Sequence, residues 1–272
     1  MERKRFKNQY GPWALVTGAA MGIGAMFVER LAALGLDLVL VDREAGLLSE
    51  QAARLGERVQ VRTCVADLAD PVQVENALDA AEDIEVGLLV ANAAHAATAP
   101  WLDIALDDKL RQIAVNCVAV TQMIDRLSRR MVERRRGGII VMSSLAGRIG
   151  SPRVATYAAT KAFDLILAES LWAELRPHGV DVLAVLPGST KTPGFEGSLT
   201  SRSKIPAAVR VMEPGDVVQT ALESLGTRPS VVAGRSNRFA SELMQRVLPR
   251  KTAIGVMTQS MRGMYPDTKE PR

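Results

Sequence analysis

The side chains best suited to chemistry in this sequence are a tyrosine and a lysine four positions apart, Tyr157 and Lys161. Residues at this spacing share one face of a helix, so the phenol and the ammonium can meet. A phenol has an ordinary pKa of about 10 and is a poor base at neutral pH, but a neighbouring positive charge favours the phenolate and lowers that pKa. The pair therefore predicts a group that gives and takes a proton.

Two adjacent serines, Ser143 and Ser144, close an apolar run upstream of the tyrosine. A hydroxyl fixed beside Tyr157 would stabilise the charge that develops on a carbonyl oxygen during hydride transfer. On their residue types alone, both serines are candidates for this task.

A glycine-rich turn joins the first apolar run to a helical pattern, with the sequence Thr17-Gly18-Ala-Ala-Met21-Gly22-Ile23-Gly24. Glycines let the backbone approach a pyrophosphate, and the start of a helix offers free N–H groups and a positive dipole. Asp42 ends the second apolar run, where a carboxylate can accept hydrogen bonds from the ribose hydroxyls of adenosine. The turn and Asp42 together predict a dinucleotide site.

The spacing TGxxxGxG resembles that of the short-chain dehydrogenases/reductases, and the resemblance extends over about residues 11–234. Other family motifs follow in the same order, although Ala94 replaces the glycine of the family's Asn-Ala-Gly motif. These motifs are Asp67-Leu68, Asn92-Ala93-Ala94, Asn116, Ser144, the YxxxK pair Tyr157 and Lys161, and Pro187-Gly188 with Thr190 and Thr192.

The resemblance implies an NAD(P)-dependent oxidoreductase that interconverts a secondary alcohol and a ketone. It implies that Ser144, thirteen positions before Tyr157, is the catalytic serine, that Lys161 also binds the nicotinamide ribose, and that Asn116 holds a water of a proton relay. The opening Tyr10-Gly-Pro-Trp13 is similar to the 3-oxoacyl reductase and hydroxysteroid dehydrogenase branch, which implies an apolar substrate. The alternative is a non-catalytic sensor or scaffold that binds a dinucleotide.

Cofactor choice depends on Asp42 and on the residues around it. A carboxylate at this position bonds both ribose hydroxyls of NAD and repels the 2′-phosphate of NADP. Met21 occupies a place where NADP-using relatives often carry a cation, whereas Arg43 can clamp a phosphate. We expect NAD as the preferred cofactor, with NADP as the alternative.

Apolar runs that alternate with amphipathic stretches predict one doubly wound, Rossmann-type α/β domain over residues 1–272, with about seven parallel strands. The expected strands are Trp13–Thr17, Leu36–Val41, Val59–Cys64, Val86–Ala91, Gly138–Met142, Val180–Leu186 and a weaker Val231–Ala233. The expected helices are Gly24–Leu34, Ala45–Leu55, Val72–Ala81, Asp107–Arg135, Thr156–Arg176 and Gly215–Leu225. Outside this pattern we expect a basic N-terminal arm over 1–10, a substrate loop over 193–213 and a C-terminal extension over 235–272.

Hydrophobic residues make up 47% of the 272 positions and charged residues 24%, which is typical of a globular protein and excludes disorder as the main state. No apolar run is long enough to span a membrane or to act as a signal peptide, so we expect a cytoplasmic protein. Cys64 and Cys117 lie in apolar runs, and neither they nor His95 and His178 form a metal-binding pattern, so we expect no metal.

Positive charge gathers at the two ends, which carry net charges of +3 over 1–10 and +5 over 235–272. These ends favour solubility and leave peripheral membrane contact open. Five arginines, Arg129, Arg130, Arg134, Arg135 and Arg136, suit a helix C-terminus, so we expect no nucleic acid as partner. The methionines of the C-terminal extension suit core or interface packing, with an apolar substrate channel as the alternative. The family resemblance implies a homodimer or homotetramer.

Overall fold

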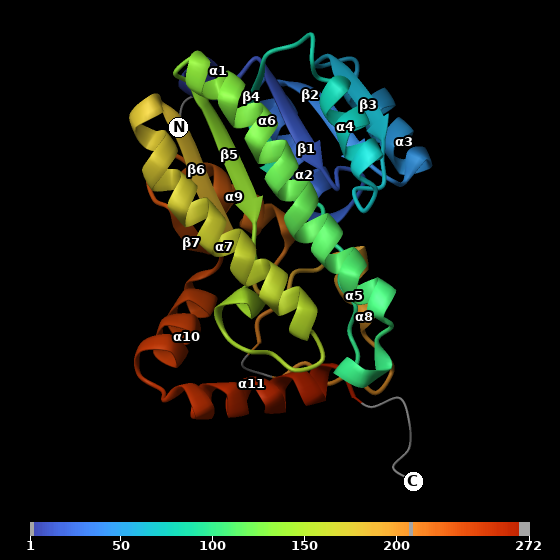
Figure 1. Cartoon of the computed structure of the whole chain (residues 1–272), viewed down its shortest axis with the longest axis vertical. Coiled ribbons are helices and arrows are strands. Elements are labelled where there is room, and N and C mark those ends of the chain that lie inside the picture. Colours follow the sequence, from blue (N-terminus) through green and yellow to red (C-terminus); the bar gives the residue numbers. More distant parts are fainter. Residues whose placement is uncertain (1–2, 207–208, 267–272) are drawn as a thin grey trace.

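The computed structural model describes residues 3–206 and 209–266 and contains one sheet of seven parallel strands. The strand order is β3-β2-β1-β4-β5-β6-β7, which confirms the predicted doubly wound fold (Figure 1). The strands are β1 Trp13–Thr17, β2 Asp37–Asp42, β3 Val61–Val65, β4 Val86–Ala91, β5 Gly137–Met142, β6 Val180–Leu186 and β7 Ser230–Val232. The order reverses between β1 and β4, and the crevice at such a switch point is where α/β sheets bind ligands.

Helices cover both faces of the sheet because successive strand residues point to opposite sides. Leu88 of β4 packs in one apolar cluster and its neighbour Leu89 in the other. On one face lie α1 Arg3–Tyr10, α2 Gly22–Ala33, α3 Ala45–Leu55 and α9 Pro214–Ser224. On the other lie α4 Pro71–Asp79, α6 Ala119–Glu133 and α7 Ala155–Leu175, and α5 Leu106–Ile113 packs against α7.

Three further helices lie beyond the carboxyl ends of the strands. Figure 1 shows two of them, α10 and α11, below the sheet. The three are α8 Pro193–Ser198, α10 Arg235–Arg246 and α11 Arg250–Met264. The predicted substrate loop therefore includes a short helix, and the predicted C-terminal extension forms two helices over its described part. Residues 1–2, 207–208 and 267–272 of the predicted arm, loop and extension lie outside the described residues.

The N-terminal arm is a correction to the sequence prediction, because it is a docked helix and not a solvated end. Phe6 and Tyr10 of α1 are buried, and their rings meet edge to face with centroids 4.8 Å apart. The Tyr10 hydroxyl donates to Asp181 Oδ2 at 2.8 Å, and Lys7 Nζ donates to the Gly35 carbonyl at 2.6 Å. Two buried aromatic side chains and these two hydrogen bonds thus fix a strongly charged segment to the core.

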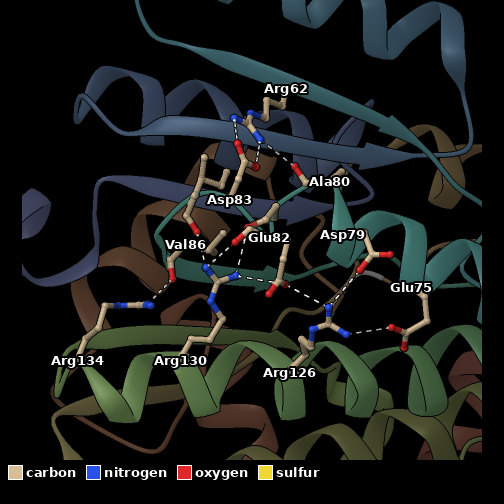
Figure 2. A network of polar contacts seen from close by, with 12 residues as sticks. Arg62, Glu75, Asp79, Ala80, Glu82, Asp83, Val86, Arg126, Arg130 and Arg134 are labelled. Carbon is tan, nitrogen blue, oxygen red and sulfur yellow. Dashed lines mark hydrogen bonds and ion pairs between the residues drawn. The ribbon is translucent and has the colours of Figure 1, made fainter.

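The arginines towards the end of α6 stabilise the fold by hydrogen bonds to main-chain carbonyls and ion pairs, in addition to the interaction with the helix dipole that the sequence predicts. Figure 2 shows Arg126 reaching to Glu75 and Asp79 of α4 and to Glu82. Arg130 reaches the segment between α4 and β4, and Arg134 reaches Val86 at the start of β4. Arg130 donates to the carbonyls of Ala81, Glu82 and Ile84, and Arg134 donates to the carbonyl of Val86. These bonds satisfy carbonyls of the connecting segment and of the first residue of β4 directly, and go beyond a favourable interaction with the helix dipole.

Within the described ranges, no helix has the length and apolar character needed to cross a membrane. Over the same residues, His, Cys, Asp and Glu side chains form no group of three or more that is suited to a metal ion.

Candidate active site

The glycine turn between β1 and α2 has the backbone geometry of a phosphate cradle. Gly18 and Gly22 adopt φ values of +63° and +60°, which favour glycine. A Cβ atom on Gly24 would lie 1.8 Å from the Gly18 carbonyl oxygen, so only glycine fits there. Met21, the residue before α2, makes no capping hydrogen bond through its side chain, which leaves N–H groups of the first helical turn for an anion.

Thr17 and Asn92 brace this turn against the end of β4. The Thr17 hydroxyl accepts the N–H groups of Asn92 and Ala93, both at 3.0 Å. The Asn92 amide donates to the carbonyls of Thr17 and Gly18 at 2.9 and 3.2 Å. Thr17 is buried and does not line the pocket, so its place is in the support of the turn.

Asp42, at the end of β2, is held firmly at the edge of the cradle. Its carboxylate accepts the Ala20 N–H at 2.9 Å and the Glu44 N–H at 3.2 Å. The neighbouring Arg43 side chain is 59% exposed and lies 3.3 Å from Glu44. The carboxylate is therefore fixed by backbone groups, whereas the guanidinium extends into solvent.

Asp67, which follows β3, has a partner that sequence reasoning missed. Arg111 of α5 donates to Asp67 Oδ2 at 2.6 Å, and both residues line the pocket. Burial opposes the charged form, but the hydrogen bond and charge of Arg111, together with the Ala69 N–H and the charge of Arg43, outweigh it, and the pKa of Asp67 is lowered. The residues are 44 positions apart, and no local pattern signals such a contact.

The two serines after β5 have different surroundings. The Ser143 hydroxyl is buried and donates to the Lys161 carbonyl at 2.6 Å. The Ser144 hydroxyl accepts the Ala146 N–H at 3.2 Å and keeps its own proton for another acceptor. This difference supports the choice of Ser144 as the hydroxyl that faces a substrate.

Tyr157 and Lys161 lie on the same face of α7, as the spacing predicts. Lys161 Nζ lies 5.8 Å from the centre of the Tyr157 ring. The ammonium is buried and donates to the Met142 carbonyl and to Asp164 Oδ2, both at 2.8 Å. The nearest charge to Lys161 is thus a carboxylate three residues further along the helix.

Asn116 interrupts the helix that the sequence predicts over residues 107–135. Residues Ala114–Val118 form a π-helical turn between α5 and α6. The buried Asn116 amide accepts the His95 N–H and donates to the His95 carbonyl and the Thr160 hydroxyl. Both N–H donors of this amide are therefore engaged, so a water at Asn116 would have to donate to an oxygen, either that of the side chain or that of the main chain.

His95 lies next to Asn116, with which its main chain exchanges hydrogen bonds. Its Nε2 lies 2.5 Å from Asp108 Oδ1, and its ring lines the pocket beside the end of β4. The sequence suggests only a loop position for His95, because the contact with Asp108 depends on how α5 packs.

The segment after β6 folds over the glycine turn. Thr192 caps α8 by accepting the Phe195 N–H at 3.2 Å, and a Cβ atom on Gly22 would lie 3.0 Å from the Thr192 methyl group. Pro187 is joined to the serine loop through its carbonyl, which accepts the Leu145 N–H at 3.0 Å. Pro187, Gly188, Thr190 and Thr192 all line the pocket.

The predicted site residues gather around one pocket of about 1310 Å³. Only Thr17, Gly24 and Asn116 among them do not line it, and these three brace its walls. Such a volume exceeds the range of about 300–1,000 Å³ typical of one small ligand, and suits a dinucleotide together with a substrate.

The C-terminal segment supplies the apolar wall of this pocket, whereas the sequence favours packing as the role of its methionines. Its members include Leu243, Met244, Leu248, Val256, Met257, Met261, Met264 and Tyr265. Arg148 holds the wall in place: its guanidinium donates to the Ser241 hydroxyl at 2.9 Å, and its carbonyl accepts from Gln245 and Arg250. The alternative interpretation, an apolar substrate channel, agrees with this placement.

Comparison with known proteins agrees with this geometry. The short chain dehydrogenase family model matches residues 12–202. The chain is 31% identical to a 7beta-hydroxysteroid dehydrogenase of Collinsella aerofaciens over 85% of this chain and 89% of that protein. It is 30% identical to a very-long-chain 3-oxoacyl-CoA reductase of Phaeosphaeria nodorum over 95% of this chain and 78% of that protein.

A solved structure from a study of 7beta-hydroxysteroid dehydrogenase stereoselectivity superposes on this chain with a TM-score of 0.86. The two sequences are 29% identical, and the match covers 93% of this chain and 98% of the chain in that structure. The chain therefore belongs to the short-chain dehydrogenase/reductase family and is an NAD(P)-dependent oxidoreductase acting on CH–OH and C=O groups.

Proposed function

We propose that this enzyme interconverts an extended, apolar secondary alcohol and its ketone, such as a steroid or a 3-oxoacyl compound. The observation that carries the proposal is the continuity of the pocket, which joins the glycine turn to the methionine wall and has Tyr157 and Ser144 on its lining. The relatives named for hydroxysteroid and 3-oxoacyl substrates support this substrate class.

The residues present fit a dinucleotide, because the turn accommodates only glycine at Gly24 and the carboxylate of Asp42 is fixed beside it. When bound, the nicotinamide ring supplies or accepts the hydride. In the oxidising direction the phenolate of Tyr157 takes the proton of the substrate hydroxyl as the carbonyl forms. The Ser144 hydroxyl donates to the same oxygen, and Lys161 keeps a positive charge close to the phenol.

A substrate panel tests this proposal. We expect kcat/KM for hydroxysteroids or 3-hydroxyacyl thioesters to exceed that for short secondary alcohols by about 10²-fold or more, because each buried methylene contributes about 0.8 kcal/mol. Met257→Asp, in the apolar wall, is expected to lower kcat/KM for the extended substrates about tenfold while sparing the short ones, which serve as the internal control. Equal rates for long and short alcohols in the native enzyme would contradict the proposal.

The alternative of a non-catalytic sensor receives no support from the relatives, which are named as reductases or dehydrogenases. We also propose that NAD is the preferred cofactor, because Asp42 is fixed by Ala20 and Glu44 while Arg43 extends into solvent. We further propose that the chain forms a single domain, a view supported by the one continuous sheet among its described residues. We also propose that it acts in the cytoplasm.

We propose that two copies of the chain associate through α5 and α7. These helices pack against each other, and Leu110, Ile113, Phe163 and Ile166 on them leave large apolar side chains exposed. Exposed apolar side chains that gather on one face are typical of an interface, and two-fold symmetry lets one such face meet itself.

Light scattering after size exclusion is expected to give at least twice the mass of one chain. Ile166→Glu should reduce the mass towards that of a monomer, since it buries a charge at the interface. Leu47→Glu, at another exposed apolar residue on α3, should not change it. A monomeric native protein would rule out the interface.

A further inference from the structure

Lys161 has a close partner that the mechanism above does not use. Asp164, one turn further along α7, holds Lys161 Nζ at 2.8 Å, and the two side chains are only 3% and 1% exposed. The third atom of this arrangement is the Met142 carbonyl oxygen at the end of β5, also 2.8 Å from Nζ. A buried ion pair therefore lies near the Tyr157 ring, whose centre is 5.8 Å from Nζ.

We propose that Asp164 is a positioning residue, which fixes the Lys161 ammonium in the active site and keeps it charged during the reaction. The inference rests on the proposed roles of Lys161 and Tyr157.

The hydrogen bonds of the ammonium support this role. A lysine ammonium has three N–H donors. Asp164 and Met142 take two of them on the side of α7 and β5. One donor is left for the pocket, where a ribose hydroxyl or the phenol oxygen can accept it. With two donors fixed, the position of Nζ does not depend on the freedom of a four-carbon chain.

The charge of Asp164 opposes the effect of burial on Lys161. Burial alone would lower the pKa of Lys161, but the charge of Asp164, with smaller contributions from Tyr157 and Cys117, outweighs it and the pKa is raised. These are the titratable groups that face the ammonium: Asp164 and Tyr157 lie on α7, and Cys117 lies on the π-helical turn. Burial and the charge of Asp164 raise the pKa of Cys117 to about 11, so the thiol stays neutral below pH 10.

Asp164 is not simply a stabilising residue. Its Oδ1 atom is buried and has no hydrogen-bond partner within residues 3–206 and 209–266. Burial raises the pKa of Asp164, which the Lys161 ammonium offsets in part. A half-satisfied buried carboxylate lowers stability, and a well-packed apolar side chain in its place is often neutral or better. Its presence is explained by what it does to Lys161.

The pH profile of the reaction separates positioning from mere packing. Alcohol oxidation needs the Tyr157 phenolate and the Lys161 ammonium together. In the native enzyme the ammonium keeps its proton throughout pH 6–10, because its pKa is raised. In Asp164→Asn the burial effect is opposed only by the smaller contributions of Tyr157 and Cys117, so the pKa of Lys161 falls and we expect the ammonium to lose its proton as pH rises within this range. Activity should then decline on the alkaline side.

We expect kcat/KM for alcohol oxidation by Asp164→Asn to acquire a descending limb and to fall at least tenfold below the scaled native profile by pH 10. The affinity for the dinucleotide should fall over the same alkaline pH range. The matched control is Glu169→Gln, which removes the same charge from α7 at a side chain that accepts from Ser230 and lies outside the pocket. It should keep the native profile. If kcat/KM of Asp164→Asn is lower than that of the native enzyme by the same factor at every pH, the proposal is overturned.

A stability measurement keeps the test decisive if Asp164→Asn fails to fold. At pH 8, Lys161→Met should lower Tm because it leaves Asp164 as an uncompensated buried charge. Lys161→Met with Asp164→Leu should recover at least half of that loss. If Lys161→Met is as stable as the native protein, the pair is not a coupled unit and the proposal fails. Neither result depends on catalysis, so failure here is distinct from failure of the proposed reaction.

Discussion

Replacing Tyr157 with phenylalanine is expected to lower kcat by about 10²-fold or more, because a positioned acid–base group contributes that much to a proton transfer. The ring is kept, so the wall of the pocket beside Val154 and Met261 stays filled. The phenol takes no part in the glycine cradle, and dinucleotide affinity should therefore stay within about threefold. Steady-state oxidation of the best substrate of the panel, together with fluorescence titration of NADH, measures both quantities.

Tyr265→Phe is the matched control, since Tyr265 also lines the pocket and loses the same hydroxyl. We expect this variant to keep well over a tenth of native kcat. The assignment of Tyr157 fails if Tyr157→Phe retains more than about a tenth of native kcat, because that loss is below what general acid–base catalysis supplies.

The sheet and the main motifs of this chain are predictable from sequence because they depend on local signals. Strands buried on both faces are apolar throughout, as in β4, and their alternation with amphipathic stretches identifies a parallel sheet. The glycine turn is equally local: the approach of Gly24 to the Gly18 carbonyl involves residues only six apart. The spacing of Tyr157 and Lys161 places both side chains on one helical face for the same reason.

Features that depend on tertiary contacts are not predictable in this way. The N-terminal helix is fixed by a hydrogen bond from Tyr10 to Asp181, 171 positions away. The π-helical turn at Asn116 follows from bonds to His95 and Thr160, which no window of sequence contains together. A hydropathy pattern of α5 and α6 reads as one helix, because a single extra residue in a turn hardly changes its periodicity.

Asp164 is an intermediate case. Its spacing of three from Lys161 is a local signal, and an acid at that distance on a helix can pair with a lysine. Charged residues are rarely buried, so the spacing by itself favours an exposed pair over a buried one. Only the packing of α7 against β5 and the π-helical turn shows that the pair is enclosed.

The next largest effect is expected from the Asp42 carboxylate, on the preference between NAD and NADP. We expect native kcat/KM for NAD to exceed that for NADP by at least about tenfold, which corresponds to about 1.4 kcal/mol. The Asp42 carboxylate cannot move aside, because it accepts the N–H groups of Ala20 and Glu44. A 2′-phosphate would meet this fixed negative charge at close range in a partly desolvated pocket.

Asp42→Ala and Arg43→Ala divide the preference between its two causes. The first should shift selectivity towards NADP, since it removes the repulsion and leaves Arg43 free to clamp the phosphate. The second should lower kcat/KM for NADP, because Arg43 lines the pocket and can clamp the phosphate. It should leave kcat/KM for NAD nearly unchanged, because the Arg43 side chain is mostly exposed and pairs with Glu44. Two results would contradict the argument: a native preference for NADP beyond tenfold, which would show that Arg43 outweighs Asp42, or an equal loss of both cofactors in Asp42→Ala. The second result would mean that Asp42 acts only as a brace for the backbone of Ala20 and Glu44, and that discrimination lies elsewhere in the pocket.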